Sequence, residues 1–234
     1  MRKFLKENLK KIGIEVKRYH LIPDYVKYLR TLDIRTVLDI GASVGDSAVL
    51  IRAFFPDAVI HSFEPLPECY AVLQSCLNDD RFYAHNFALG DKNGEFEFYR
   101  NEHTPSSSFL NIKEAHTRAF PYTAMTDRVT VQVKRLDDIW ESLKISPRAM
   151  LKIDVQGYES SVLLGADGSL DQVAAIIIEV SFIELYDNQV LFHDIYEMLT
   201  SRGFRYMSDV HRIDDPNTGM PLQANALFIR ESVQ

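Results

Sequence analysis

The chain contains 234 residues, 46% of them hydrophobic, which is enough for one α/β domain with a sizeable core. Its formal net charge of −7 argues against nucleic acid as the main partner. The longest uncharged apolar run, Val173–Ile178, is too short to cross a bilayer, and no apolar signal region follows the basic N-terminus. We therefore expect a cytoplasmic protein.

The first 33 residues are expected to form a basic helical arm in front of the domain. Residues 1–30 hold nine Lys or Arg against three acidic residues. Apolar residues recur there at helical spacing, which predicts an amphipathic helix over Arg2–Arg18. We expect this helix to pack on the flank of the domain; the alternative is weak contact of residues 1–20 with anionic lipid at the inner face of the membrane. Pro23 begins a second predicted helix that continues through Leu32.

The domain itself, expected over residues 34–234, opens with a strand, a tight turn and a helix. Thr36–Ile40 is a short β-branched run, Gly41 and Gly45 mark the turn, and Ser47–Phe55 returns to helical spacing. This order is typical of the first unit of a nucleotide-binding α/β fold.

Asp39, at the end of this first strand, helps to identify the ligand. A dinucleotide site uses G-x-G-x-x-G spacing, but here Ser43 stands where the middle glycine would be. Asp39 would also place negative charge beside a pyrophosphate. S-adenosylmethionine has no phosphate and carries an ammonium and a sulfonium, so a carboxylate at this position suits it. The structural alternative is that Asp39 only caps the turn.

Two further strands predict a parallel sheet. Ala58–Phe63 ends in Glu64–Pro65, and Glu64 follows Asp39 by 25 residues, near the spacing at which an acid holds a ribose. A helix over Glu68–Asn78 leads to a third strand, Arg81–Phe87, closed by a turn at Ala88–Asp91. Strands that alternate with helices indicate parallel pairing with right-handed crossovers.

An insertion interrupts this alternation at about residues 91–135. Glu95–Tyr99 and Val129–Val133 alternate with period two, which predicts a β-hairpin. Between them lie His103, the serines Ser106–Ser108 and a helical stretch from Leu110 to Phe120. We expect acceptor specificity to reside in this insertion and in the C-terminal hairpin.

The remaining chain completes an α/β fold with a seven-stranded, mostly parallel sheet, an antiparallel edge hairpin and the β-hairpin insertion. Asp154 ends a predicted central strand, at the edge where ligands of open α/β sheets collect, and would share a crevice with Asp39 and Glu64. As an alternative, Asp154 caps the helix that begins near Gly157. The predicted helices are Leu136–Leu143, one from near Gly157 through Leu164, and Val190–Ser201. The predicted strands are Met150–Val155, Ala174–Val180, Phe204–Met207 and Asn225–Arg230.

Several blocks in order resemble the FkbM family of S-adenosylmethionine-dependent methyltransferases. They are VLDIGASVGDSA, Phe63–Glu64–Pro65, ALGDKNGEFEFY, the serines Ser106–Ser108, VKRLDDIW and LKIDVQGYESSVLLGA, within residues 34–230. The resemblance implies a Rossmann-like methyltransferase fold and methyl transfer to a hydroxyl oxygen of a natural product or of a sugar in a surface glycan. It carries cofactor roles to Asp39, Gly41, Gly45 and Glu64, and active-site placement to Asp154, Gly157 and Glu159. Within the matching blocks, we add Ala42, Ser43, Pro65, Ala88 and Asp154 to the expected cofactor site.

A hydroxyl acceptor needs a general base near the donor methyl group. Asp154 is the first candidate by position, Glu159 the second, and His103 is an alternative in the insertion. No metal is predicted, although Asp154 with Glu179 or Glu159 could offer hard oxygen ligands to magnesium. The expected partners are the donor and a small-molecule or glycan acceptor, and no motif predicts an oligomeric state.

Two other functions compete with methyl transfer. One is an NAD(P)-dependent oxidoreductase or epimerase, which also uses a strand–turn–helix unit. The other is a non-catalytic domain that kept the fold as a docking surface for glycan assembly. The first requires close backbone approach to a pyrophosphate, and the second does not require Asp39, Glu64 and Asp154.

Overall fold

The computed structural model describes residues 22–231. The helix expected over Arg2–Arg18 and the alternative membrane contact of residues 1–20 lie outside this range. Pro23 precedes α2 (Asp24–Arg30), slightly shorter than expected. Within the described range, no helix is both long enough and apolar enough to span a bilayer.

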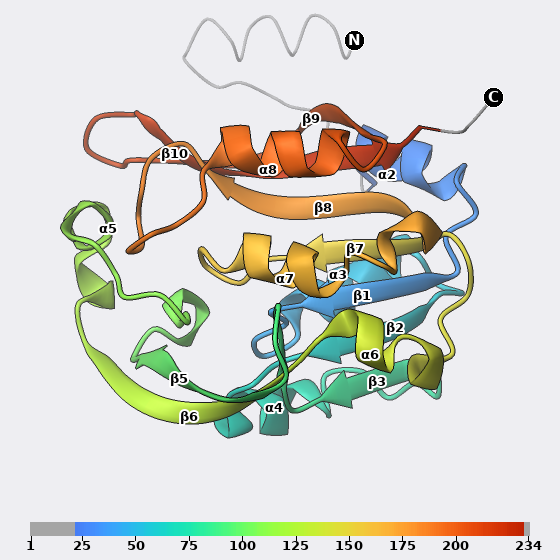
Figure 1. Ribbon diagram of the computed structural model, residues 1–234, viewed down its shortest axis with the longest axis horizontal. Coiled ribbons are helices and arrows are strands. Elements are labelled where there is room, and N and C mark those ends of the chain that lie inside the picture. The colour runs from blue at the N-terminus through green and yellow to red at the C-terminus, as the bar shows by residue number, and fades with distance from the viewer. Residues whose placement is uncertain (1–21, 232–234) are drawn as a thin grey trace, which may run out of the picture.

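A seven-stranded sheet forms the centre of the molecule (Figure 1). Its order is β3-β2-β1-β7-β8-β10-β9, with the first five strands parallel and the last two antiparallel to their neighbours. This confirms the predicted fold class. The strands are β1 (Thr36–Ile40), β2 (Val59–Phe63), β3 (Phe82–His85), β7 (Ala149–Ile153), β8 (Val173–Ser181), β9 (Phe204–Asp214) and β10 (Pro221–Arg230).

Helices cover both faces of this sheet and bury its apolar side chains. On one face, α2 and α3 (Asp46–Phe54) pack through Leu29 and Ile51 against the strands. On the other face lie α6 (Leu136–Ile139), α7 (Glu159–Gly165) and α8 (Phe192–Thr200), which are in front of the sheet in Figure 1. Burial on both faces explains why the central strands are apolar along their length.

The insertion supplies two strands of a second, three-stranded sheet beside the carboxyl edge of the main sheet, on the left in Figure 1. β5 (Gly94–Asn101) and β6 (Thr126–Lys134) pair antiparallel, as the alternating pattern predicts. The connecting segment contains the 3₁₀ turn η1 (Thr104–Ser106), the helix α5 (Glu114–Ala119) and the turn η2 (Pro121–Thr123). α4 (Pro67–Leu73) packs against this sheet through Cys69.

Some predicted boundaries were wrong. The turn expected at Ala88–Asp91 begins with β4 (Ala88–Leu89), which pairs parallel with β6. Both side chains of β4 are buried. The helix expected over Glu68–Asn78 ends at Leu73, so Cys76 follows it; both cysteines are free thiols. β9 and β10 are longer than predicted because their mutual pairing extends beyond the apolar segments. Two short 3₁₀ turns, η3 (Glu141–Leu143) and η4 (Leu170–Gln172), complete the connections.

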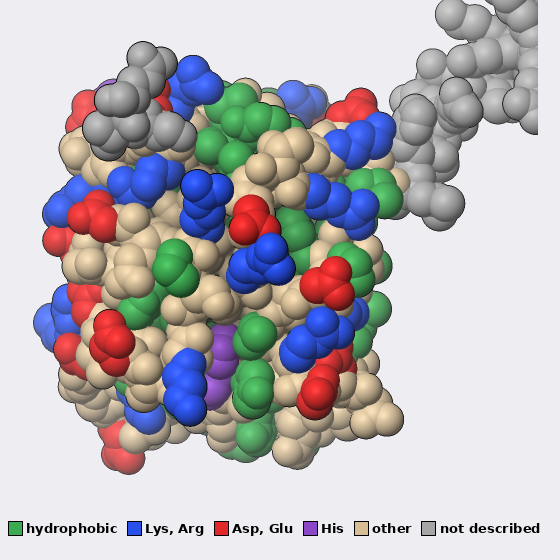
Figure 2. Space-filling view, turned by 90° about the vertical axis from the view of Figure 1, so that its right-hand side faces the viewer, with side chains coloured by type: hydrophobic (Ala, Val, Ile, Leu, Met, Phe, Trp, Pro, Cys, Tyr) green, Lys and Arg blue, Asp and Glu red, His purple; other side chains and the backbone are tan. Residues whose placement is uncertain are grey.

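The opposite end of the molecule, where the parallel strands begin, has a mixed surface. Figure 2 shows Lys and Arg interspersed with Asp and Glu on this face, with small apolar patches between them.

Gly165 offers a test of the packing between α7 and the start of the insertion. A Cβ on Gly165 would lie 1.9 Å from the backbone carbonyl oxygen of Gly90, so Gly165→Ala must displace backbone. We expect it to lower the free energy of unfolding by about 2 kcal/mol or more, measured in urea. Gly168→Ala is the matched control, because its Cβ would meet its nearest neighbours, in Asp137, at an ordinary 3.5 Å. Equal stability of the two variants would contradict this packing.

Candidate active site

A cleft opens at the carboxyl edge of the main sheet, between the ends of β1, β2 and β7. It encloses about 510 Å³ including its open mouth. The insertion closes its outer side. The cleft is lined by Ile40, Gly41, Ser43, Phe63, Glu64, Pro65, Ala88, Leu89, Phe98, Thr104, Pro105, Ser107, Phe109, Asp154, Val155 and Gln156.

The two glycines of the first turn have different structural roles. Gly41 adopts φ +82°, and a Cβ there would lie 1.9 Å from the carbonyl oxygen of Asp154. The turn after β1 therefore rests directly on the loop after β7. Gly45 adopts φ +99° and packs on Cys76, outside the cleft lining. Its N–H donates to the carbonyl oxygen of Ala42. Ala42 is buried and is also not among the lining residues.

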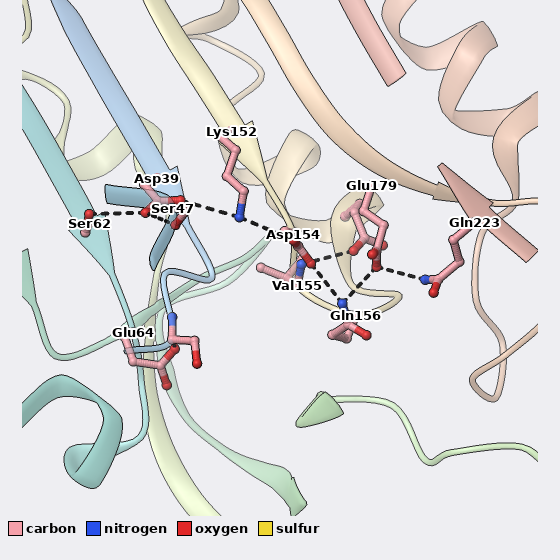
Figure 3. Close-up of polar contacts among 12 residues, drawn as sticks. Asp39, Ser47, Ser62, Glu64, Lys152, Asp154, Val155, Gln156, Glu179 and Gln223 are labelled. Atoms are coloured by element: carbon pink, nitrogen blue, oxygen red, sulfur yellow. Dashed lines mark hydrogen bonds and ion pairs between the residues drawn. The ribbon is translucent and has the colours of Figure 1, made fainter. Parts of the chain in front are cut away.

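Asp39 lies beneath this turn and does not line the cleft. Its side chain is fully buried, and its Oδ2 accepts hydrogen bonds from Ser47 Oγ at 2.5 Å and Ser62 Oγ at 3.4 Å. Its Oδ1 lies 3.5 Å from Lys152 Nζ (Figure 3). The charge of Asp39 is thus directed at a lysine of the protein.

Lys152 joins the ends of β1 and β7 electrostatically. It pairs in register with Asp39, and its Nζ lies 3.2 Å from Asp154 Oδ2. Burial opposes a charge on Lys152, but the carboxylates of Asp154 and Asp39 outweigh it and raise the pKa of the lysine. Lys152 was not predicted as a site residue, although a lysine in an apolar strand, two residues from an acid on the same face, was an available signal.

Glu64 forms part of the cleft wall, beside Pro65 and near Ala88. Only 6% of its surface is exposed; Oε2 accepts from the N–H of Ser43 at 3.0 Å and Oε1 from the N–H of Leu66 at 2.9 Å. Burial raises the pKa of Glu64 to about 7, against the opposing effect of these backbone donors. Glu64 is therefore an acid whose charge can change near neutral pH.

The loop after β7 contributes Asp154 to the cleft. Its side chain is 28% exposed, and its two oxygens contact Lys152 Nζ and, at 2.8 Å, Gln156 Nε2. Glu159 points away from the cleft: its Oε1 accepts the N–H groups of Val155 and Gly157, each at 3.1 Å. Burial raises the pKa of Glu159 to about 7. Glu159 thus shapes the loop that presents Asp154.

The insertion reaches the same loop through its serines. Ser107 lines the cleft, and Ser108 Oγ donates to the backbone carbonyl of Gln156 at 2.6 Å. His103 is exposed, with Nδ1 3.3 Å from Ser106 Oγ, and is not among the lining residues. The structure therefore brings Gly41, Ser43, Glu64, Pro65, Ala88 and Asp154 to one cleft, and leaves Asp39, Ala42, Gly45, Glu159 and His103 outside its lining.

Side chains suited to metal binding do not converge in the described part of the chain. Between residues 22 and 231, no group of three or more His, Cys, Asp or Glu could hold an ion. Glu179, considered as a magnesium ligand with Asp154, is instead bonded to the amides of Gln156 and Gln223.

Comparison with known proteins identifies relatives over most of the chain. A family model described as Methyltransferase FkbM domain matches residues 39–206. The 2-O-methyltransferase NoeI of Sinorhizobium fredii (strain NBRC 101917 / NGR234) is 27% identical over 172 residues, covering 70% of this chain and 71% of that protein. Methyltransferase 1 of Beauveria bassiana (strain ARSEF 2860) is 27% identical over 181 residues, covering 72% and 71%.

A solved structure supports the fold independently of close sequence similarity. It is a Listeria monocytogenes protein assigned as an S-adenosylmethionine-dependent methyltransferase, with a TM-score of 0.50, 9% identity and coverage of 99% of this chain and 100% of that one. At this identity, the likeness concerns the fold alone.

Lys152 offers a test of the electrostatic link. Lys152→Met would leave Asp39 buried without its cation, and we expect the free energy of unfolding in urea to fall by about 3–5 kcal/mol. Adding Asp39→Asn should restore part of that loss, because the amide removes the unpaired charge. A Lys152→Met variant within about 0.5 kcal/mol of the wild type would contradict the link.

Proposed function

Because the chain belongs to the FkbM methyltransferase family, we propose that it transfers a methyl group from S-adenosylmethionine to a hydroxyl oxygen. The acceptor we propose is a sugar of a surface glycan or a natural product. The observation that carries this proposal is that one cleft contains both Glu64, which could accept hydrogen bonds from ribose hydroxyls, and Asp154, which could accept a proton from the acceptor. The relative NoeI, a 2-O-methyltransferase, supports oxygen as the acceptor atom.

The lining of the cleft fits this donor better than a dinucleotide. Its charged residues in the described chain are the acids Glu64 and Asp154, with no Lys or Arg among the lining side chains. The N–H of Ser43 already donates to Glu64, so it is not free to bind a phosphate. An acidic cleft favours a cationic ligand without phosphates. This argues against the oxidoreductase or epimerase alternative.

Gly41, Ser43, Glu64, Pro65 and Ala88 would hold the donor, with Glu64 at the ribose hydroxyls. Asp39 would act indirectly, by keeping Lys152 and the turn in place, and not as a partner of the donor's cationic end. When bound, S-adenosylmethionine supplies a methyl group on a sulfonium, which an oxygen nucleophile displaces in line. The protein must then align the acceptor and remove its proton.

Asp154 is the group we propose for proton removal. It is exposed to the cleft, whereas Glu159 is turned into the loop and His103 lies outside the lining. Lys152 and Gln156 each hold one oxygen of Asp154 and keep the carboxylate oriented. Each oxygen retains a second lone pair that can accept the proton of the acceptor. The intact acid in an open cleft also argues against a non-catalytic docking domain.

Asp154→Asn tests the base directly. The amide keeps the size of the side chain but cannot take up the proton, so we expect kcat to fall at least about a hundredfold. Donor affinity, measured by calorimetry with S-adenosylhomocysteine, should stay within a few-fold. Asp80→Asn is the control, because the Asp80 side chain is 97% exposed and Asp80 is not among the residues that line the cleft. Full activity of Asp154→Asn would exclude this residue as the base.

Glu64 predicts a pH dependence of donor binding. Its pKa of about 7 means that the carboxylate gains a proton as the pH falls through neutrality. We expect the affinity for S-adenosylhomocysteine to fall below pH 7, because the protonated acid is a weaker acceptor for ribose hydroxyls. Glu64→Gln should bind weakly at every pH, with a flat profile. Calorimetry between pH 6 and 8.5 measures both, and a wild-type profile without this dependence would refute the assignment.

A further inference from the structure

Gln156 occupies the centre of a hydrogen-bond network that the proposed reaction leaves unexplained. Its Nε2 donates to Asp154 Oδ1 at 2.8 Å and to Glu179 Oε2 at 2.9 Å (Figure 3). Its Oε1 accepts from the hydroxyl of Tyr186 at 2.9 Å. Two carboxyl groups on one side and a hydroxyl donor on the other fix which end of the amide faces Asp154.

The backbone of Gln156 is also held in an unfavourable conformation. It adopts φ +55°, in the left-handed region that is sterically unfavourable for a residue with a Cβ. Ser108 from the insertion fixes its carbonyl. Strain of this kind persists where surrounding contacts define the geometry, and it is common at functional sites.

Glu179 is a second buried carboxyl group that accepts a hydrogen bond from the Gln156 amide. It is 5% exposed, and its Oε2 accepts from Gln156 and, at 2.8 Å, from Gln223 Nε2. Burial, with the charges of Asp154 and Glu159, raises the pKa of Glu179 well above its usual value. Asp154 has Lys152 as its cation, whereas the direct hydrogen-bond partners of Glu179 are amides.

We propose that Gln156 is a positioning residue for Asp154: its amide NH₂ group holds the carboxylate in the cleft and separates it from the buried Glu179. Tyr186 completes the arrangement by holding the other end of the amide. Its hydroxyl also lies 3.4 Å from His116 Nε2 and from the carbonyl of Ser106, so the insertion supports the same contact. The inference rests on the proposed role of Asp154 as the base.

The ionisable groups around Asp154 come from four elements. Lys152 on β7 contacts it directly, Asp39 on β1 reaches it through Lys152, and Glu159 on α7 and Glu179 on β8 add negative charge. Tyr186, in the segment between β8 and α8, is a further ionisable group outside these four elements, and the charges of Glu179, Glu159 and Asp154 act on it. A further acid at position 156 would meet two carboxyl groups with no donor between them.

Gln156→Glu is the decisive variant. It replaces the shared NH₂ group by an oxygen, so a proton must be taken up to relieve the repulsion. We expect the acidic limb of the pH–kcat profile to move up by about one pH unit or more. The titration of the Asp154 carboxyl, followed by ¹³C NMR and assigned with Asp154→Asn, should move in the same direction.

Gln223→Glu is the matched control, because the described hydrogen bonds of Gln223 reach Glu179 but not Asp154. Gln156→Met is a second variant without added charge; because it removes the amide donor to Asp154, it should lower kcat several-fold and move the acidic limb up by less than Gln156→Glu does. Circular dichroism and thermal unfolding establish that each variant is folded.

The outcomes separate this inference from the proposed function. An upward movement of both the Asp154 titration and the acidic limb, largest in Gln156→Glu, smaller in Gln156→Met and absent in Gln223→Glu, supports the inference. An unchanged Asp154 titration in Gln156→Glu, or an equal change in Gln223→Glu, overturns it. A changed titration with an unchanged pH–kcat profile instead overturns the role of Asp154 as base, and with it the catalytic role of Gln156.

Discussion

The ammonium of Lys152, held between the carboxylates of Asp39 and Asp154, is the interaction on which the site depends. It connects the ends of β1 and β7, the two strands where the order of the sheet reverses. At such a switch point the following loops diverge and leave a crevice. Because Asp39 is fully buried, its charge would be costly without this cation. The same lysine fixes one oxygen of Asp154, so a structural ion pair also orients the residue that faces the cleft.

The insertion completes the cleft from the other side. Phe98, Thr104 and Phe109 line it, and Ser108 is bonded to the loop that contains Gln156. The insertion is therefore in direct contact with the loop that presents Asp154. This arrangement suits an enzyme whose donor contacts come from the main sheet and whose acceptor contacts come from the added strands. It gives a physical reason to look for acceptor specificity in the insertion.

The sequence predicted the fold and much of the cleft because strand ends and turns are local features. Glu64 and Asp154 each follow an apolar strand, and parallel strands bring such ends to one edge. The role of Asp39 was less accessible, because its partner Lys152 lies 113 residues away and is identified only by strand register. The packing of Gly45 on Cys76 was not predictable, because Cys76 lies in a loop after α4, whereas the sequence pattern predicts a helix over Glu68–Asn78. The amides around Glu179 come from separate strands and loops and have no local signature.

The most direct test of the whole account is a crystal structure with S-adenosylhomocysteine, the product of methyl donation. We expect the nucleoside between Pro65 and Ala88, the ribose hydroxyls on Glu64, and the sulfur directed towards Asp154. Asp39 should keep its contact with Lys152 and stay away from the ligand. Binding at any other surface, or a ribose that does not contact Glu64, would contradict the proposed site.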